Sequence, residues 1–356
     1  MKILTVVGAR PQFIKAAAVS NIIRKEHEEI LVHTGQHYDE NMSKVFFEEL
    51  QIPKPDYNLG VGSGGHGKQT GKMLIELEEI YEKEKPDLIL VYGDTNSTLA
   101  GALCGSKLLI PVAHVEAGLR SFNMNMPEEQ NRILTDHISK LLFVPTVTAI
   151  NNLKNEGISE GVHNVGDVMY DAVLHFKSLA VSKTSIIEKL NLKEGSYILT
   201  TIHRAENTND INRLKNIIEA LNESGKKIVL PLHPRTRKYM ENYSLKFNNN
   251  INVIEPVGYL EMISLEMHSE KIVTDSGGVQ KEAFFIKKPC VTMRDETEWV
   301  ETVQNGWNVV VGTDKNKILD SILNFVPNQQ QQNIFGDGHA AEKILDIIND
   351  DILNIK

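Results

Sequence analysis

Cysteine is almost absent from this sequence: 356 residues include only Cys104 and Cys290. Two cysteines in small or apolar surroundings cannot form a disulfide framework, so we expect both to be reduced packing residues. Long hydrophobic runs are absent as well. The apolar segment at residues 3–7 stops at Gly8, which is too short for a signal peptide or a membrane span of roughly 20 residues. The sequence therefore predicts a soluble, cytoplasmic protein with no membrane partner.

Neither sign of charge dominates the composition. Lys and Arg number 38 against 47 Asp and Glu, a formal net charge of −9, and 41% of the residues are hydrophobic. These values are typical of a globular chain, and its length favours two domains over one. An acidic chain is a poor partner for nucleic acid, so we expect any bound phosphate to lie in a local pocket.

The motifs of the common cofactor sites are also missing. The turn at residues 8–11 has neither the Gly-x-Gly-x-x-Gly of dinucleotide sites nor the Lys-Ser/Thr of ATP loops. Cys-x-x-Cys does not occur, and His33 and His37 straddle a strand end, so we expect no metal. Arg10 and Lys15 instead lie at a helix start, which is typical of an anion site. The alternative is a capped helix with solvated basic residues.

Short apolar runs alternate with amphipathic stretches along the whole chain. Strands that are apolar throughout and separated by helices indicate βαβ units, and two such series indicate two Rossmann-like domains whose parallel sheets face a central cleft. The best boundary follows Asp167, which gives domains at residues 1–167 and 168–338. The expected strands lie at residues 2–7, 30–34, 87–92, 112–115, 141–144, 163–165, 197–201, 227–232, 251–254, 271–274, 290–293 and 308–311.

Three carboxylates in the first domain follow strands or open helices. Asp94 follows the strand at 87–92, Glu116 follows the next strand, and Glu128 lies at the start of a helix. Each by itself could be a helix cap or a solvated side chain. Three at one edge of one sheet indicate acid–base chemistry. His114, inside an apolar strand, is predicted to be a packed histidine.

The second domain places cationic and small residues at the same kind of position. His203 with Arg204, and His233 with Arg235, follow successive strands. Ser276, Gly277 and Gly278 begin a helix, where exposed backbone N–H groups and small side chains favour a phosphate. Glu282, about one turn further on, is placed to accept hydrogen bonds from a ribose.

Seven motifs occur in order along nearly the whole chain. They are Gly8-Ala9-Arg10-Pro11, Gly93-Asp94-Thr95, His114-Val115-Glu116-Ala117-Gly118-Leu119-Arg120, Pro127-Glu128-Glu129, His203-Arg204, Asp275-Ser276-Gly277-Gly278 and Met293-Arg294-Asp295. Together they closely resemble the non-hydrolysing UDP-N-acetylglucosamine 2-epimerases. The resemblance implies the two-Rossmann architecture of B-type glycosyltransferases, a homodimer, no metal or other cofactor, and a C-terminal helix (339–356) that packs back on the first domain.

The resemblance also implies roles for individual residues. Residues matching the catalytic positions of the family are Asp94, Glu116, Glu128 and His203. Residues matching substrate-binding positions are Arg10, Lys15, Arg132, His233, Ser276, Gly277, Gly278 and Glu282. The implied reaction converts UDP-N-acetylglucosamine to UDP-N-acetylmannosamine by elimination of UDP and re-addition through a 2-acetamidoglucal. The expected partners are then a UDP-sugar and UDP. The expected use of the product is the supply of polysaccharide precursors.

Three departures from the family pattern concern the substrate. Trp299 stands where a substrate-contacting arginine is expected, and Gln12 stands where glutamate is frequent. Residues 35–38 only partly match the loop that forms an allosteric substrate site in some members. These features resemble the branch acting on UDP-2,3-diacetamido-2,3-dideoxyglucuronic acid, which is the alternative substrate. Other interpretations are a glycosyltransferase, a hydrolysing epimerase and a non-catalytic nucleotide-sugar sensor.

Overall fold

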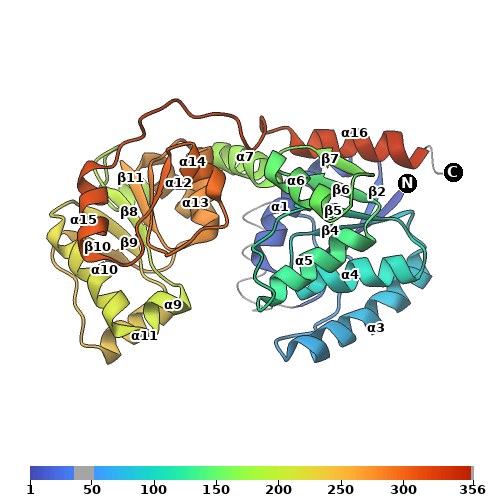
Figure 1. Cartoon of the computed structure of the whole chain (residues 1–356), viewed down its shortest axis with the longest axis horizontal. Coiled ribbons are helices and arrows are strands. Elements are labelled where there is room, and N and C mark those ends of the chain that lie inside the picture. Colours follow the sequence, from blue (N-terminus) through green and yellow to red (C-terminus); the bar gives the residue numbers. More distant parts are fainter. Residues whose placement is uncertain (36–51, 354–356) are drawn as a thin grey trace. The chain divides into compact units, whose positions relative to one another are not determined.

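The structure, a computed structural model, describes residues 1–35 and 52–353, apart from the side chains of Arg10 and of residues 351–353. The chain divides into two compact units (Figure 1). Unit 1 contains residues 1–175 and 333–356, and unit 2 contains residues 176–332. Each unit is built around one parallel sheet, as the alternation of apolar runs and helices predicts.

The sheet of unit 1 has the strand order β3-β2-β1-β4-β5-β6-β7, and every described pair of strands is parallel. Its predicted strands are all present, with ends within two residues of the predicted ends, and the two-residue β3 is an addition. The strands are β1 (Lys2–Val7), β2 (Glu28–His33), β3 (Tyr57–Asn58), β4 (Leu88–Tyr92), β5 (Val112–Val115), β6 (Leu141–Val144) and β7 (Val162–Asn164).

Helices cover the sheet of unit 1, and α3, α4 and α5 lie side by side along it (Figure 1). The helices are α1 (Arg10–Ile23), α3 (His66–Glu84), α4 (Asn96–Lys107), α5 (Pro127–Ile138), α6 (Val147–Asn155) and α16 (Ala340–Leu353); α7 (Val168–Lys183) begins in unit 1 and ends in unit 2. Single residues explain where three of these helices begin. Pro11 lies in the first turn of α1, Thr95 caps α4 and Thr146 caps α6.

Unit 2 repeats the arrangement with the strand order β10-β9-β8-β11-β12-β13, again parallel. The strands are β8 (Ile198–Thr201), β9 (Ile228–Pro231), β10 (Ile251–Ile254), β11 (Lys271–Thr274), β12 (Cys290–Thr292) and β13 (Asn308–Val310). The helices are α8 (Ile186–Lys189), α9 (Ala205–Thr208), α10 (Ile211–Glu223), α11 (Pro234–Asn242), α12 (Tyr259–His268), α13 (Gly277–Phe285), α14 (Val300–Gln304) and α15 (Lys315–Asn324).

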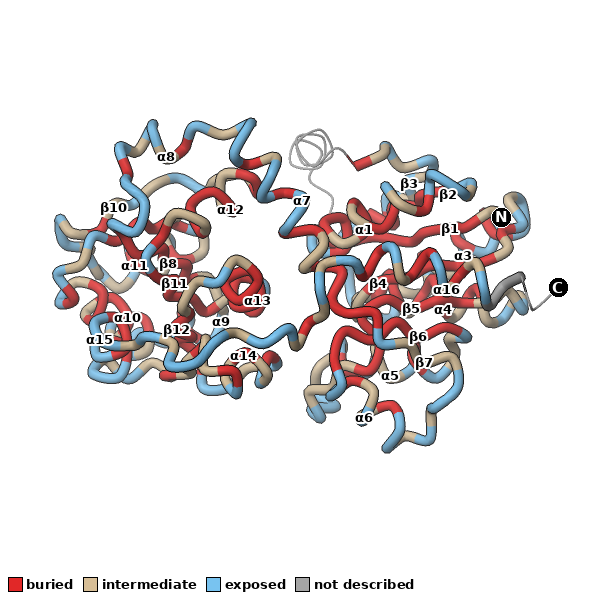
Figure 2. The backbone as a smooth tube through the Cα atoms, turned by 90° about the horizontal axis from the view of Figure 1, so that it is seen from above, coloured by how far each residue is buried: buried red, intermediate tan, exposed pale blue. Residues whose placement is uncertain are grey.

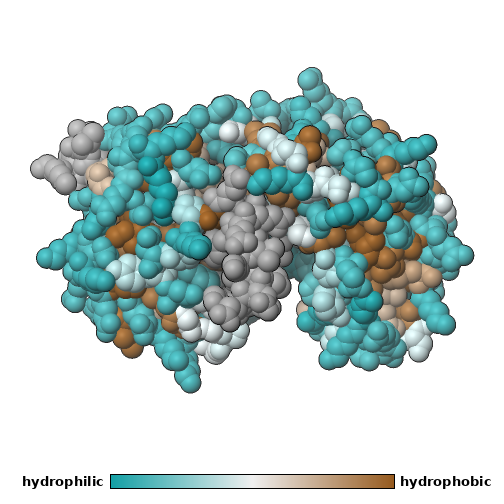
Figure 3. Space-filling model, turned by 180° about the vertical axis from the view of Figure 1, so that it is seen from behind, coloured by the Kyte–Doolittle hydropathy of each residue, from teal (hydrophilic) through white to brown (hydrophobic). Residues whose placement is uncertain are grey.

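Burial explains why these runs form central strands. Every residue of β4, β5, β6, β8 and β11 is buried, and Figure 2 shows the strands of both sheets as the buried interior of each unit. A strand that has helices on both faces needs apolar side chains on both, which produces continuous rather than alternating patterns. The face in Figure 3 is mainly hydrophilic, with small hydrophobic areas.

The strand order fixes where ligands can bind. In unit 1 the order reverses between β1 and β4, and in unit 2 between β8 and β11. In open parallel sheets the crevice beyond the carboxyl ends at such a reversal is the ligand site. The turns that follow these four strands begin at Gly8, Gly93, Ile202 and Asp275. Asp94, His203 and Ser276 lie in these turns, and Arg10, Gly277 and Gly278 lie at the helix starts that follow.

The last helix belongs to unit 1 although it follows unit 2 in sequence. α16 packs against α1, and Ile344 and Ile348 are fully buried there. At the far end of α1, His27 Nε2 lies 2.8 Å from Asn349 Oδ1. The prediction that the C-terminal helix packs back on the first domain is therefore confirmed.

Candidate active site

The turn after β4 holds Asp94 between two polar partners. Gly93 adopts a φ of 66°, which a glycine accepts without strain, and its carbonyl accepts a hydrogen bond from His114 Nε2 at 2.7 Å. The Asp94 carboxylate lies 2.7 Å from Arg132 NH2, and Asn131 donates to the Asp94 carbonyl at 2.9 Å. Asp94 and Arg132, predicted separately from the sequence, are thus brought into one ion pair.

Glu116 has an unusual backbone for a side chain of its size. Its φ is 69°, in the left-handed region that costs a non-glycine residue about 1–3 kcal/mol at functional sites. The turn directs its buried carboxylate to Lys15 Nζ, with which it forms an ion pair. A Cβ placed on Gly93 would lie 3.5 Å from Glu116 Oε2 and 3.7 Å from Lys15 Nζ. The structure therefore brings Lys15 and Glu116 together beside the Asp94 turn.

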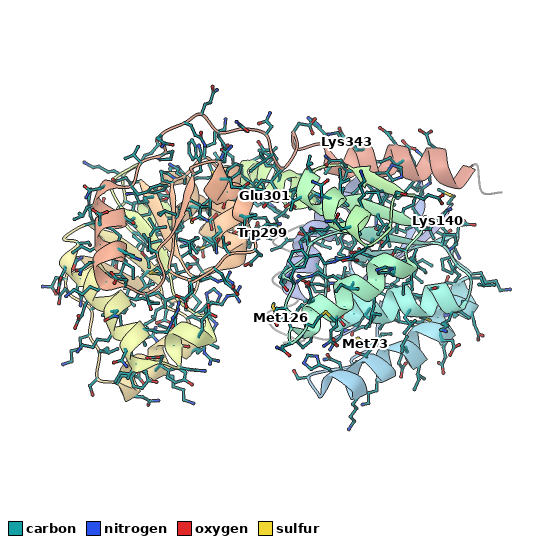
Figure 4. All side chains as sticks on the ribbon, viewed as in Figure 1. Met73, Met126, Lys140, Trp299, Glu301 and Lys343 are labelled. Carbon is teal, nitrogen blue, oxygen red and sulfur yellow. The ribbon has the colours of Figure 1, made fainter. Side chains whose placement is uncertain are left out.

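The start of α5 supplies two neighbouring carboxylates with different surroundings. Glu129 is buried, accepts hydrogen bonds from the backbone N–H groups of Ser121 and Phe122, and lies 2.6 Å from Arg132 NH1. Glu128 is exposed in the first turn of α5, the helix whose N-cap is Met126, labelled in Figure 4. In the described residues no hydrogen bond or ion pair engages the Glu128 carboxylate, which leaves it available for proton transfer. Sequence reasoning found Glu128 and Arg132 and missed Glu129.

Gln12 connects the turns after β1 and β4, and sequence reasoning did not assign it a role. Its Oε1 accepts from the N–H groups of Gly8 and Ala9 at 2.8 and 3.0 Å. Its Nε2 donates to the Tyr92 carbonyl at 2.6 Å and to Thr98 Oγ1 at 2.9 Å. Because the amide both accepts and donates, it ties the loop that carries Arg10 to the loop that carries Asp94.

His114 is a packed strand histidine, as predicted, and it belongs to a buried ion cluster. Its Nδ1 lies 2.7 Å from Asp136 Oδ1, and Asp136 Oδ2 accepts from Arg120 NH1 at 2.7 Å. Arg120 also binds Glu156 through two nitrogens. Burial acts to raise the pKa of Asp136, but the bonds from His114 and Arg120 outweigh it and hold this pKa below its usual range. The cluster fixes the turn that contains Glu116.

Two predicted features of unit 1 lie outside the described residues. The side chain of Arg10 is one of them, although its backbone opens α1. The other is the segment at residues 35–38, which partly matches the allosteric loop of some family members. Of this segment the structure describes only Gly35.

In unit 2, Asp275 organises the turn that contains His203. Its carboxylate accepts from the N–H groups of His203 and Arg204 and from Asn207 Nδ2, each at 3.1 Å. The rings of His203 and His233 lie 5.7 Å apart between centroids. Burial, together with the charges of His203 and Arg235, lowers the pKa of His233 against the opposing effect of Asp275. The two predicted histidines are therefore neighbours, and the structure adds Asp275 as the residue that holds the backbone of His203.

The start of α13 has the features of an anion site. Ser276 lies at the N-cap, and its side chain does not cap the helix, so backbone N–H groups of the first turn stay available. A Cβ on Gly277 would collide with Glu298 Oε1 and would lie 3.6 Å from Arg204 NH2. Arg294 NH1 binds Glu298 at 2.7 Å. A side chain at residue 277 would therefore displace the Glu298 carboxylate, and two arginines lie at this helix start.

Further along α13, Lys281 and Glu282 are both buried. Glu282 accepts a hydrogen bond from the Tyr259 hydroxyl at 2.9 Å. Lys281 Nζ lies 4.0 Å from the centroid of the Trp299 ring, a cation–π contact at the start of α14 (Figure 4). The position where the family pattern predicts an arginine is therefore occupied by an indole that binds a lysine from the neighbouring helix.

Among the described residues no group of three His, Cys, Asp or Glu side chains could hold a metal ion. Within the same residues, no helix is both long and apolar enough to cross a membrane.

Two doubly wound parallel sheets with ionisable side chains beyond their carboxyl ends define an α/β enzyme of the B-type glycosyltransferase architecture. The family model described as UDP-N-acetylglucosamine 2-epimerase matches residues 21–349. The chain belongs to this family, and it is an isomerase that epimerises C2 of a UDP-2-acetamido sugar. The family predicted from the seven motifs is confirmed.

Similar proteins cover almost the whole chain. A UDP-N-acetylglucosamine 2-epimerase homologue of Methanococcus maripaludis is 60% identical over 98% of this chain and 99% of its own length. The UDP-2,3-diacetamido-2,3-dideoxy-D-glucuronate 2-epimerase of Pseudomonas aeruginosa is 55% identical, with coverage of 98% and 99%. The crystal structure of the Methanocaldococcus jannaschii UDP-GlcNAc 2-epimerase, in complex with UDP-GlcNAc and UDP, superposes with a TM-score of 0.86 at 48% identity, again over 98% and 99%.

Proposed function

We propose that the chain converts UDP-N-acetylglucosamine to UDP-N-acetylmannosamine by anti elimination of UDP and re-addition through a 2-acetamidoglucal. The observation that supports this mechanism most directly is the group of carboxylates at neighbouring strand ends of unit 1. Glu116 is buried against Lys15, and Asp94 is paired with Arg132. Glu128 is exposed in the first turn of α5.

The chemistry explains why one carboxylate is insufficient. A sugar C2–H is not acidic, so it is removed as the anomeric diphosphate departs from the opposite face. Inversion then requires a proton to be delivered to the other face of C2, where the first base cannot reach. Two carboxyl groups are therefore needed, one to remove the proton and one to deliver it, and the candidates are Asp94, Glu116 and Glu128. The Lys15 ammonium stabilises the charge of Glu116 in its buried position.

We propose residues 168–338 as the UDP-binding domain and residues 1–167 as the domain that carries the acid–base groups. The start of α13, at Ser276, Gly277 and Gly278, would hold the diphosphate. His203, oriented by Asp275, would stabilise its departing charge, with His233 beside it. Glu282 would accept hydrogen bonds from the ribose. In unit 1, Arg10 and Lys15 are proposed as substrate-binding cations.

A second substrate, UDP-2,3-diacetamido-2,3-dideoxyglucuronic acid, is favoured by one specific observation. The pair of Lys281 and Trp299 replaces the expected arginine with a cation held on another helix, and an acidic sugar requires a cation. The relative named for this substrate is 55% identical to the chain, between the 60% of the UDP-N-acetylglucosamine 2-epimerase homologue and the 48% of the solved UDP-GlcNAc epimerase. The two sugars must therefore be compared directly.

The test is turnover of each UDP-sugar in heavy water, followed by NMR. Carboxyl protons exchange quickly with solvent, so the epimerised product should contain deuterium at C2. Free N-acetylmannosamine in place of the UDP-sugar would indicate the hydrolysing reaction, and UDP release that needs an acceptor would indicate a glycosyltransferase. Epimerised product without deuterium at C2 would overturn the mechanism.

We further propose a cytoplasmic homodimer. Unit 1 exposes several large apolar side chains, and an interface between copies would cover them. These residues are Ile75, Leu109, Phe122, Met124, Leu134 and Val147. The two buried, unpaired cysteines fit a reducing compartment. Light scattering at several concentrations measures the mass directly, and a mass of one chain at all of them contradicts the dimer.

A further inference from the structure

Glu266 is a buried carboxyl group to which the proposed mechanism assigns no task. It lies in the last turns of α12, and none of its surface is exposed. Among the described residues, neither of its carboxyl oxygens receives a hydrogen bond from an N–H or hydroxyl donor. A buried ionised carboxylate without donors or a cation is strongly disfavoured, so this group requires an explanation.

The side chain that Glu266 does meet is Glu282. Burial, the charge of Glu282 and a hydrogen bond between the two carboxyl groups all act to raise the pKa of Glu266, and Glu282 accepts a hydrogen bond from the Tyr259 hydroxyl at 2.9 Å. A hydrogen bond between two carboxyl groups requires a proton on one of them, since two carboxylates offer acceptors only. Both groups are buried, so ionising both would place two negative charges together at low dielectric. The pair therefore holds one proton.

Three observations place that proton on Glu266. Glu266 lies near the C-terminal end of α12, where the helix dipole disfavours negative charge. Glu282, by contrast, accepts a hydrogen bond from the Tyr259 hydroxyl, which favours its charged form. Burial and the charge of Glu282 raise the pKa of Glu266 well above its usual range.

The remaining ionisable groups around the pair do not neutralise Glu266. Lys271 donates to the carbonyls of Ser321 and Ile322 at 2.9 Å, Lys288 donates to the Ser269 carbonyl at 2.8 Å, and Lys281 lies over Trp299. Tyr197 and Cys290 are buried acids whose pKa values are raised, mainly by burial and in part by Glu266. Burial and Glu282 account for the raised pKa of Glu266, and no cation in the described residues acts against them.

We propose that Glu266 is a positioning residue: a neutral carboxylic acid whose O–H donates to Glu282 and holds that carboxylate ready to accept the hydroxyl groups of a nucleotide ribose. The inference rests on the proposed function in one respect, the ribose contact of Glu282. With Tyr259 and Glu266 donating to it, the Glu282 carboxylate stays ionised and oriented before the nucleotide arrives.

Calorimetric binding of UDP and of 2′,3′-dideoxy-UDP tests this role. Glu282→Gln should reduce the preference of the protein for UDP by about 10-fold or more, because a hydrogen bond to a charged acceptor is lost. Glu266→Leu removes the donor at similar volume and should reduce the same preference by about 10-fold. Glu266→Gln, whose amide N–H₂ can donate in place of the acid, should keep most of the preference. Glu261→Gln, which removes a carboxylate from the same helix away from the pair, is the control and should change nothing.

The outcomes separate the two hypotheses. If Glu282→Gln leaves the preference for UDP intact, the ribose contact in the proposed function is wrong. If Glu282→Gln removes the preference but Glu266→Leu does not, the ribose contact stands and the positioning role of Glu266 is overturned.

Infrared spectroscopy tests the proton itself and does not depend on nucleotide binding. The C=O stretch of a protonated carboxyl group should be present in the native protein at neutral pH and absent from Glu266→Gln. Identical spectra in this region would overturn the proposal even if Glu266→Leu fails to fold.

Discussion

Glu116 combines burial, a left-handed backbone and an ion pair with Lys15. The backbone turn points the carboxylate at the Lys15 ammonium group. The ion pair with Lys15 stabilises the charge and helps to offset the free-energy cost of the unusual φ. A residue held in this way is suited to remove or deliver a proton at one fixed point.

We therefore expect Glu116→Gln to lower kcat by about 10²- to 10⁴-fold, the usual effect of removing a general acid or base. The amide keeps the size of the side chain, and UDP binding in unit 2 should change little. Steady-state kinetics and calorimetry with UDP measure the two effects. Equal losses in kcat and in UDP affinity would show that the substitution acts on structure rather than on proton transfer.

A pH effect on stability is expected at His33, at the end of β2. Burial lowers the pKa of its imidazole to about 4, against an ordinary value of 6.5 in the unfolded chain. Between these values the unfolded state binds more protons than the folded state, so stability falls as the pH falls from about 6.5 to about 4. The full effect is about 3 kcal/mol.

His33→Asn removes this titration and should flatten the pH dependence of unfolding relative to the native chain. Urea unfolding at several pH values gives both curves, and their difference isolates His33 from the other ionisable groups. The loss of the ring contact with Phe13, at 5.0 Å between centroids, adds only a constant offset. Parallel curves would contradict the prediction.

At the scale of elements, the turns that follow β1 and β4 act as one structure. Gln12 spans them through its amide, and Thr34 Oγ1 and Ser97 Oγ, 2.8 Å apart, join the β2 end to α4 in the same region. The turn that holds Asp94 and the start of α1 therefore share one support.

Gln12→Ala should lower the free energy of unfolding by about 1–3 kcal/mol, because buried backbone N–H groups of Gly8 and Ala9 lose their acceptor. It should also lower kcat, since the Asp94 turn loses its link to β1. Gln12→Glu keeps the acceptor for the Gly8 and Ala9 N–H groups and loses the donor to the Tyr92 carbonyl and to Thr98 Oγ1, so it should be milder on both measures. Urea unfolding and steady-state kinetics test the order; equal effects of the two variants would argue against this connection.

At the scale of the whole molecule, unit 1 is completed by residues that follow unit 2 in the sequence. α16 covers α1 with Ile344 and Ile348 fully buried, so the first unit lacks part of its core until the chain returns to it. Unit 2, by contrast, is continuous in sequence from residue 176 to 332.

Ile348→Ala should cost about 2–5 kcal/mol of stability, as for other buried large-to-small substitutions. Hydrogen exchange should accelerate in α1 and remain unchanged in α10. The matched variant Ile318→Ala, fully buried on α15 of unit 2, should accelerate exchange in α10 and leave α1 protected. Acceleration in both units by either variant would show that they unfold together.

The predicted strands and the ordered motifs were readable because their causes are local. A strand covered on both faces must be apolar throughout, and a helix start that receives an anion needs small residues such as Gly277 and Gly278. The two-residue β3 has no such pattern and was missed. Gln12 and Glu129 were missed because an amide or a carboxylate at a helix start has an ordinary capping interpretation.

By itself, the sequence determined the α/β class, the two sheets, the family and the residue types that the reaction needs, since each depends on short patterns. Only the tertiary structure decided which of those residues meet. The pairing of Arg132 with Asp94, of Lys281 with Trp299 and of Glu266 with Glu282 joins residues on different elements. Such pairs depend on how helices and strands pack in space, and spacing along the chain does not encode them.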